Sequence, residues 1–137
     1  MCSSDLESEL QEIRMRLGAS RLVTLTGAGG VGKTRLAIQV AEEMAEEYPD
    51  GVWFIELAAL SDPALVPRAL ASAQAIPEEP NRTSVESLLY ALRPKTLLLI
   101  LDNCEHLIEA CARLIEVILS GCPHVRVLTT SPGNTFS

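Results

Sequence analysis

The sequence predicts an α/β fold in which helices cover both faces of a parallel sheet. Short β-rich runs alternate along the chain with segments that have helical periodicity. Residues 97–101 are all aliphatic, which is typical of a strand that is covered on both faces. A helical segment separates each strand from the next, and parallel pairing needs such crossovers.

The first half of the chain begins with a helix expected over residues 5–17, where leucine and isoleucine recur at helical spacing up to Leu17. A strand is expected over 21–26, followed by a glycine-rich segment and a helix from Lys33 to about Tyr48. A second strand is expected over 52–57, after the turn at 49–51. Asp62 and Pro63 are a typical N-cap and first residue of the next helix.

In the second half, residues 83–86 have the spacing of a capping box and predict a helix that Pro94 ends. The third strand is expected over 96–101. A helix is expected over 105–119, with Gly121 as its C-terminal cap. A fourth strand follows over 125–129. The expected order is strand, helix, strand, two helices, strand, helix, strand.

Composition excludes several classes of function. The 137 residues include 11 basic and 18 acidic residues, and a net charge of −7 argues against direct nucleic-acid binding. No apolar run approaches the roughly 20 residues of a membrane span. The N-terminus lacks the pattern of an export signal, and the four cysteines form no CxxC pair. We therefore expect a cytoplasmic protein with reduced thiols and no membrane association.

A glycine-rich segment between the first strand and the next helix has the pattern GxxxxGK[ST]. This pattern is typical of a phosphate-binding loop, because glycines allow successive N–H groups to turn inward around an anion. We expect Lys33 to contact the outer phosphates and the Thr34 hydroxyl to bind Mg²⁺. A glycine-rich turn that only caps a helix is the alternative. The candidate nucleotide contacts are Gly27, Ala28, Gly29, Gly30, Val31, Gly32, Lys33, Thr34 and Arg35.

Asp102 is the candidate for a second Mg²⁺ contact. It follows the aliphatic run at 97–101, and an acid at the carboxyl end of a buried parallel strand lies where α/β sheets bind ligands. After a phosphate loop, such an acid can hold Mg²⁺ through its water shell. The alternative is a helix-capping aspartate.

The group that activates water is left open by the sequence. Asn103 follows Asp102 and can orient a water molecule, but it cannot accept a proton at neutral pH. Glu105 is a candidate base, with stabilisation of a helix dipole as its alternative role. Glu56, near the end of the second strand, is another. Lys33, Asn103 and Glu105 are therefore the catalytic candidates, and we expect hydrolysis to be slow or absent.

Four segments together resemble the P-loop NTPase domain of signal-transduction ATPases, the STAND class related to NB-ARC and AAA proteins. They are LVTLTGAGGVGKTRLA at 22–37, GVWFIELA at 51–58, LILDNCEHL at 99–107 and GCPHVRVLTTS at 121–131. They are most similar to the ATPase domain of bacterial transcriptional regulators of the LuxR and SARP types.

This resemblance implies a three-layer α/β/α sandwich with strand order 1-4-3-2, in which the family covers the edge of the first strand with a fifth strand. It implies a nucleotide-operated switch in which ATP and Mg²⁺ favour an open state and ADP a closed one. ATP, rather than GTP, enters only through this resemblance.

The chain departs from the family pattern at three places. Pro132 stands where the family has an arginine that senses the γ-phosphate, and residues 5–7 replace a Gly-Arg-Glu motif. The helical lid, the repeats and the DNA-binding domain of an intact relative are not in this sequence. We therefore expect a partial domain over 5–131, a divergent tail over 132–137 and a truncated product.

Two other functions remain open. The chain can be a remnant that acts only as an interaction module or is inactive, which nucleotide binding would distinguish. It can also be a small P-loop kinase, but that function needs an arginine-rich lid, and only Arg82 and Arg93 lie in the corresponding region.

Overall fold

The computed structural model describes residues 3–27, 30–57, 60, 62–77, 79–102 and 108–132, with side chains at 8–25, 35–57, 60, 62–77, 79–102 and 109–130. Four strands form one sheet: β1 (Leu22–Gly27), β2 (Val52–Glu56), β3 (Leu97–Asp102) and β4 (Val125–Pro132). The helices are α1 (Ser3–Ala19), α2 (Gly30–Glu43), α3 (Val66–Ala73), α4 (Ser84–Leu92) and α5 (Ile108–Gly121), with short 3₁₀ helices η1 (Ala45–Glu47) and η2 (Pro63–Leu65).

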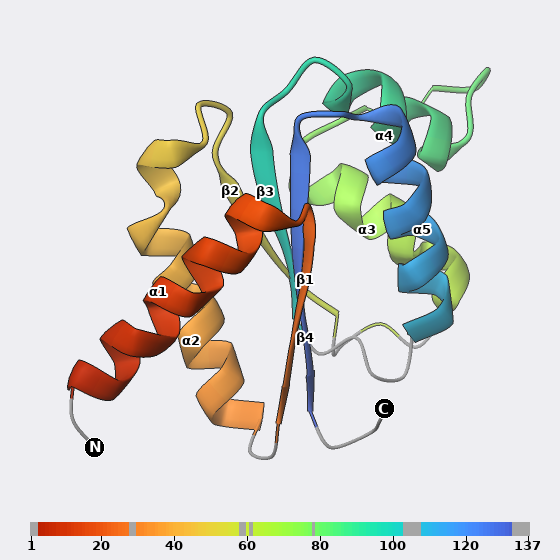
Figure 1. Ribbon diagram of the computed structural model, residues 1–137. Coiled ribbons are helices and arrows are strands. Elements are labelled where there is room, and N and C mark those ends of the chain that lie inside the picture. The colour runs from red at the N-terminus through yellow and green to blue at the C-terminus, as the bar shows by residue number, and fades with distance from the viewer. Residues whose placement is uncertain are drawn as a thin grey trace.

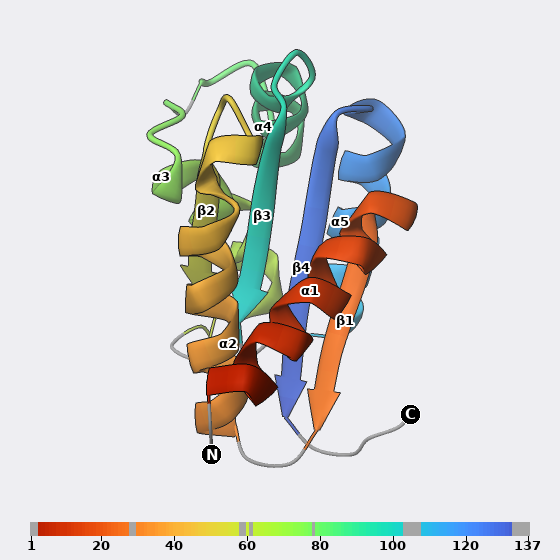
Figure 2. The same ribbon diagram turned by 60° about the vertical axis from the view of Figure 1, so that its left-hand side comes forward.

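All neighbouring strands are parallel, in the order β1-β4-β3-β2. Helices α1 and α2 cover one face of the sheet, and α3, α4 and α5 cover the other (Figures 1 and 2). The α/β/α sandwich and the strand order 1-4-3-2 are therefore confirmed. β1 and β2 are the two edge strands among the described residues.

The central strand β3 joins the two halves of the core. Its six residues are all buried. Leu97, Leu99 and Leu101 pack toward α3, α4 and α5, whereas Leu98 and Ile100 pack toward α1 and α2. This alternation is the period of two expected of a strand, and both faces find apolar partners.

Two arginines at the start of β1 and on β4 hold the ends of helices on opposite faces. Arg21 donates through Nη2 to the carbonyls of Leu119 (2.8 Å) and Cys122 (2.6 Å), at the end of α5. Arg126 donates to the carbonyls of Leu17 and Ser20, at the end of α1. The last carbonyls of a helix have no partner inside it, so these contacts satisfy them and tie both helices to the sheet.

The predicted helix boundaries shift in two places. Helix α2 begins at Gly30 rather than Lys33 and gives way to η1 before Tyr48. Gly121 is the last residue of α5 and not a left-handed cap, because Gly51 is the only glycine with positive φ among the described residues. The predicted caps of η2 and α4 are confirmed: Asp62 accepts from the amide of Ala64, and residues 83–86 form a capping box.

The sequence predicts one apolar face for the helix after Asp62, and this prediction needs a correction. The predicted face consists of Leu65, Val66, Ala69, Leu70 and Ala73. Val66, Leu70 and Ala71 are buried, whereas Leu65 is 38% exposed and Ala73 is exposed. The reason is that Leu65 belongs to η2, whose three residues per turn rotate it away from the face that α3 buries.

Neighbouring residues on α5 provide a test of this packing. Ile118 is fully buried and Val117 is 40% exposed. We expect Ile118→Ala to lower the free energy of unfolding by about 2–5 kcal/mol, because it leaves a cavity in the core. Val117→Ala is the matched control and should change it by less than about 0.5 kcal/mol. Urea denaturation measures both, and equal effects would contradict the assigned face of α5.

The thiol of Cys122 gives a second test. Burial raises its pKa, against the opposing influence of Arg93 and Arg21. The folded thiol therefore keeps its proton at a pH where the unfolded thiol has lost it. The contribution of the protonated Cys122 thiol to the free energy of unfolding is full below the unfolded pKa, about 8.5, and is lost as pH rises through the folded pKa. Denaturation at pH 7 to 10 should show a smaller loss of stability for Cys122→Ala than for the wild type. An equal loss in both proteins would show that Cys122 does not contribute.

Candidate functional site

The candidate site lies at the carboxyl edge of the sheet. Parallel pairing brings the ends of all four strands to this edge, so Gly27, Glu56, Asp102 and Pro132 end β1, β2, β3 and β4 on the same side (Figure 1). Ligands bind at this edge in open α/β sheets, outside the carboxyl ends of the strands.

Helix α2 begins at this edge, three residues after β1 ends. The first four N–H groups of a helix lack partners inside it, and here they belong to residues 30–33 of the predicted phosphate loop. These groups and the positive end of the helix dipole favour an anion. The earlier start of α2 therefore places three residues of the loop, Gly30, Val31 and Gly32, in the first helical turn.

Four predicted site residues, Ala28, Gly29, Asn103 and Glu105, lie outside the described residues. The side chains of Val31, Lys33 and Thr34 are not described either. Arg35 is exposed on α2. The roles given to these residues stay predictions. Asp102 and Glu56 are the predicted candidates that can be examined as side chains.

Asp102 lies at the edge and faces α2. The alternation along β3 puts its side chain on the same face as Leu98 and Ile100, which pack in the cluster that includes α2. Asp102 as a whole residue is 1% exposed. Helix α2 contacts all four strands, so this face of the sheet is the one that the phosphate-loop helix covers.

Thr130 on β4 is a contact of Asp102 that sequence reasoning missed. Its hydroxyl Oγ1 donates to Oδ1 of Asp102 at 2.5 Å, and Thr130 is also 1% exposed. Thr130 lies two residues beyond Leu128, which packs toward α1 and α2, so both side chains lie on that face. The available signal was a pair of threonines that follows the apolar residues Val127 and Leu128 in this strand.

Buried polar side chains concentrate at this edge. Among the described residues, the buried polar or charged side chains are those of Asp102, Thr129, Thr130 and Ser87; Asp102 is the last residue of β3, and the two threonines lie near the end of β4. Thr129 bonds to the hydroxyl of Thr24 at 3.1 Å, on the other face of the sheet. Buried polar groups cost free energy unless they are paired, and on the α2 face Thr130 and Asp102 pair with each other.

Glu56 is the second carboxylate at this edge. It is the register partner of Asp102 in the β2–β3 pair, and neighbouring strands lie about 4.8 Å apart. Glu56 is exposed, whereas Asp102 is buried. The two acids therefore occupy different environments side by side, and Glu56 is accessible to water.

The donor set fits Mg²⁺, which prefers carboxylate oxygens and retains several waters. Asp102 supplies a carboxylate on the face of the sheet that α2 covers, and the predicted Thr34 hydroxyl would come from the first turns of that helix. The described residues contain no cluster of three or more His, Cys, Asp or Glu that could hold a metal. Mg²⁺ at nucleotide sites usually keeps several waters and binds substrate phosphates besides one or two carboxylates, so a metal here would use phosphate oxygens and water as well as protein ligands.

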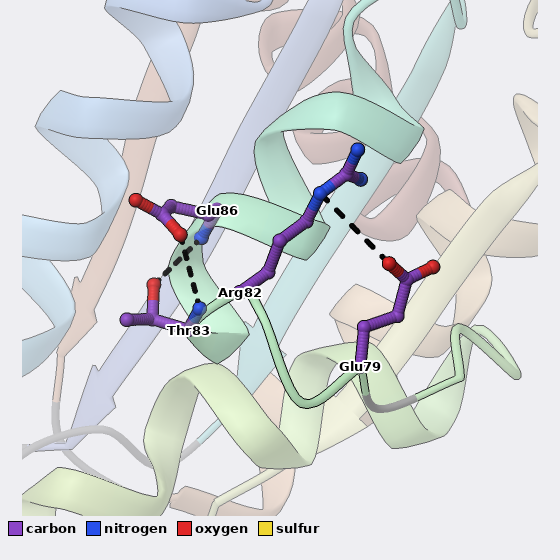
Figure 3. A network of polar contacts seen from close by, with 4 residues as sticks. All are labelled: Glu79, Arg82, Thr83 and Glu86. Atoms are coloured by element: carbon purple, nitrogen blue, oxygen red, sulfur yellow. Dashed lines mark hydrogen bonds and ion pairs between the residues drawn. The ribbon is translucent and has the colours of Figure 1, made fainter.

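The connection between α3 and α4 lies at the opposite end of the sheet (Figures 1 and 2). A cavity of about 270 Å³ there is lined by Arg68, Ser72, Thr83 and Ser87, among others. Arg82 stacks on Tyr90, with its guanidinium 4.4 Å from the ring centroid, and pairs with Glu79 at 3.9 Å (Figure 3). These contacts hold Arg82 away from the carboxyl edge and give no support to a role as a kinase lid.

Residues 21–135 match the family described as NACHT domain. The chain belongs to this NACHT family. This match covers all four strands, including the carboxyl edge that carries Asp102 and Thr130. The identification of the chain as a P-loop NTPase domain is thereby confirmed.

Similar proteins include bacterial regulators. The chain is 44% identical over 119 residues to a protein of Mycobacterium tuberculosis named as an HTH-type transcriptional regulator. The matched region covers 87% of this chain but only 13% of that protein. The chain is 33% identical over 117 residues to the regulatory protein AfsR of Streptomyces griseus, covering 78% of the chain and 11% of AfsR. The predicted relationship to the ATPase domains of bacterial regulators is confirmed.

Solved structures share the NACHT chain's fold at low sequence identity. Cdc6p from Pyrobaculum aerophilum has a TM-score of 0.71 at 18% identity, covering 93% of this chain and 38% of that one. The ORC2 protein of Aeropyrum pernix has a TM-score of 0.63 at 17% identity, covering 94% and 40%. Across the described residues, no helix has the length and apolar character needed to span a bilayer.

Proposed function

We propose that the chain binds ATP together with Mg²⁺ and is the nucleotide-switch core of a signal-transduction regulator. The observation that carries this proposal is the buried Asp102 carboxylate on the α2 face, at the edge where α2 begins. The GxxxxGKT pattern between β1 and α2 supplies the phosphate-binding part of the same site. A cytoplasmic location goes with this proposal.

The residues of the site have separate tasks in this mechanism. The N–H groups at the start of α2 and the Lys33 ammonium bind the phosphates. Thr34 and Asp102 bind the metal or its water shell. Mg²⁺, when bound, neutralises charge on the phosphates and orients them. The residues that would hold the nucleotide follow β1, end β3 and begin α2, so binding would act on how these elements pack.

Hydrolysis is proposed to be slow. Many related sites have a second acid directly after the aspartate that corresponds to Asp102. Here Asn103 stands at that position, and it cannot accept a proton from water. Glu56 is exposed beside Asp102 and is the described carboxylate nearest in the sheet, whereas Glu105 lies outside the described residues. A chain that binds ATP and retains it suits a switch, because the bound nucleotide then defines a lasting state.

Nucleotide binding separates this proposal from an inactive remnant. Isothermal titration of the full chain with ATP and Mg²⁺ should give a binding isotherm that is lost in Lys33→Ala. Lys95→Ala, an exposed lysine at the start of β3, is the matched control and should bind as the wild type does. Absence of binding by the wild type would favour the interaction-module interpretation.

Single-turnover assays with radiolabelled ATP test the slow hydrolysis. We expect a rate constant below about 1 s⁻¹, the lower end of typical enzyme turnover. Glu56→Gln and Glu105→Gln, each compared with the wild type, identify the base as the variant that abolishes the residual rate. A wild-type rate of hundreds per second would contradict the proposal of a slowly hydrolysing switch.

A further inference from the structure

The hydrogen bond between Thr130 and Asp102 is short and joins two buried side chains. The two residues are 28 positions apart in the sequence, lie on neighbouring strands and are each 1% exposed. The hydroxyl donor lies 2.5 Å from Oδ1, at the short end for a bond to a carboxylate oxygen. Because water hardly reaches either group, the protein itself must supply partners for this carboxylate.

The register of the sheet places Thr130 between the two parts of the proposed site. On one side, β4 pairs with β3, whose last residue is Asp102. On the other side, Thr130 is the register partner of Leu25 on β1, two residues before β1 ends at Gly27 and the phosphate loop begins. Thr130 thus lies in the strand that bridges the acid and the loop.

We propose that Thr130 is a positioning residue for metal binding: its hydroxyl fixes the Asp102 carboxylate in the orientation that receives nucleotide-bound Mg²⁺. This inference rests on the proposed function. A carboxylate has two oxygens with about four acceptor sites, and the bond from Thr130 uses one site on Oδ1, so this bond is compatible with a metal or its water at the same carboxylate. Fixing the carboxylate in advance lowers the entropy that must be lost when the ligand binds.

Groups that hydrogen-bond to metal ligands affect affinity strongly even though they do not touch the metal. Losing such a partner typically costs about 10–100-fold in metal affinity. We expect loss of the Thr130 hydroxyl to reduce the gain in ATP affinity that Mg²⁺ provides by the same factor. Affinity for ATP without metal should not change, because the proposed role of Thr130 is to orient a metal ligand.

Thr129 offers a matched control on the same strand. It is also a buried threonine, 5% exposed, but its hydroxyl bonds to Thr24. Its side chain points to the opposite face from Thr130, because successive residues of a strand alternate. Removing this hydroxyl perturbs the end of β4 to a similar extent without touching Asp102.

The test measures the dissociation constant for ATP in the presence of Mg²⁺ and in the presence of EDTA, on the full chain, and compares their ratio among variants. We expect Thr130→Val to reduce the benefit of Mg²⁺ by about 10–100-fold. Thr130→Ser, which keeps the hydroxyl, and Thr129→Val should both retain the wild-type ratio. In an Asp102→Asn background, Thr130→Val should cause no further change.

The outcomes separate the failure of this inference from the failure of the proposed function. If Thr130→Val keeps the wild-type ratio, or if it and Thr129→Val reduce the ratio equally, the positioning role is wrong while ATP binding stands. If the wild type binds no ATP, the proposed function fails and this inference fails with it. Thermal unfolding of each variant checks its folding, and Thr130→Ala replaces Thr130→Val if the latter does not fold.

Discussion

The candidate site depends on the burial of β3 between two layers of helices. Because both faces of this strand are covered, the parallel sheet has an apolar interior, and the one carboxylate on the strand stands at its end. Asp102 is therefore almost completely buried. Burying a charged group costs free energy on the order of several kcal/mol unless it is paired, and the hydrogen bond from Thr130 offsets part of this cost.

The rest of the molecule maintains this arrangement. Arg21 and Arg126 attach the ends of α5 and α1 to the sheet, so that the helices on both faces are fixed relative to β1 and β4. Both attachments lie at the end of the sheet away from Asp102. The arginine contacts to helix ends thus lie at one end of the sheet, and the hydrogen bond between Thr130 and Asp102 lies toward the other.

The sequence alone predicted the elements well, because their signals are local. The aliphatic run of β3, the caps at Asp62 and Thr83, and the phosphate-loop pattern each lie within a few residues. Strand order came through the resemblance to known ATPases, since nothing local states which strands pair. The start of α2 at Gly30 was missed because glycine is a poor helix former, a rule that does not apply to a first turn whose free N–H groups serve an anion.

Contacts within the site were less predictable for a physical reason. Thr130 meets Asp102 only because β4 inserts between β1 and β3, and the register of β4 depends on the whole sheet. The same register sets Glu56 beside Asp102. This makes Glu56 a stronger candidate for the base than the sequence indicated, since the sequence favoured Glu105.

The most direct test of the account locates the metal. Mn²⁺ replaces Mg²⁺ in the complex with ATP, and its paramagnetism broadens the amide resonances of nearby residues. The account predicts selective broadening at residues 30–33, at Asp102 and at Thr130, with sharp signals at Tyr90 and in the rest of α4. Broadening that is uniform, or centred on α3 and α4, would contradict a nucleotide site at the carboxyl edge of the sheet.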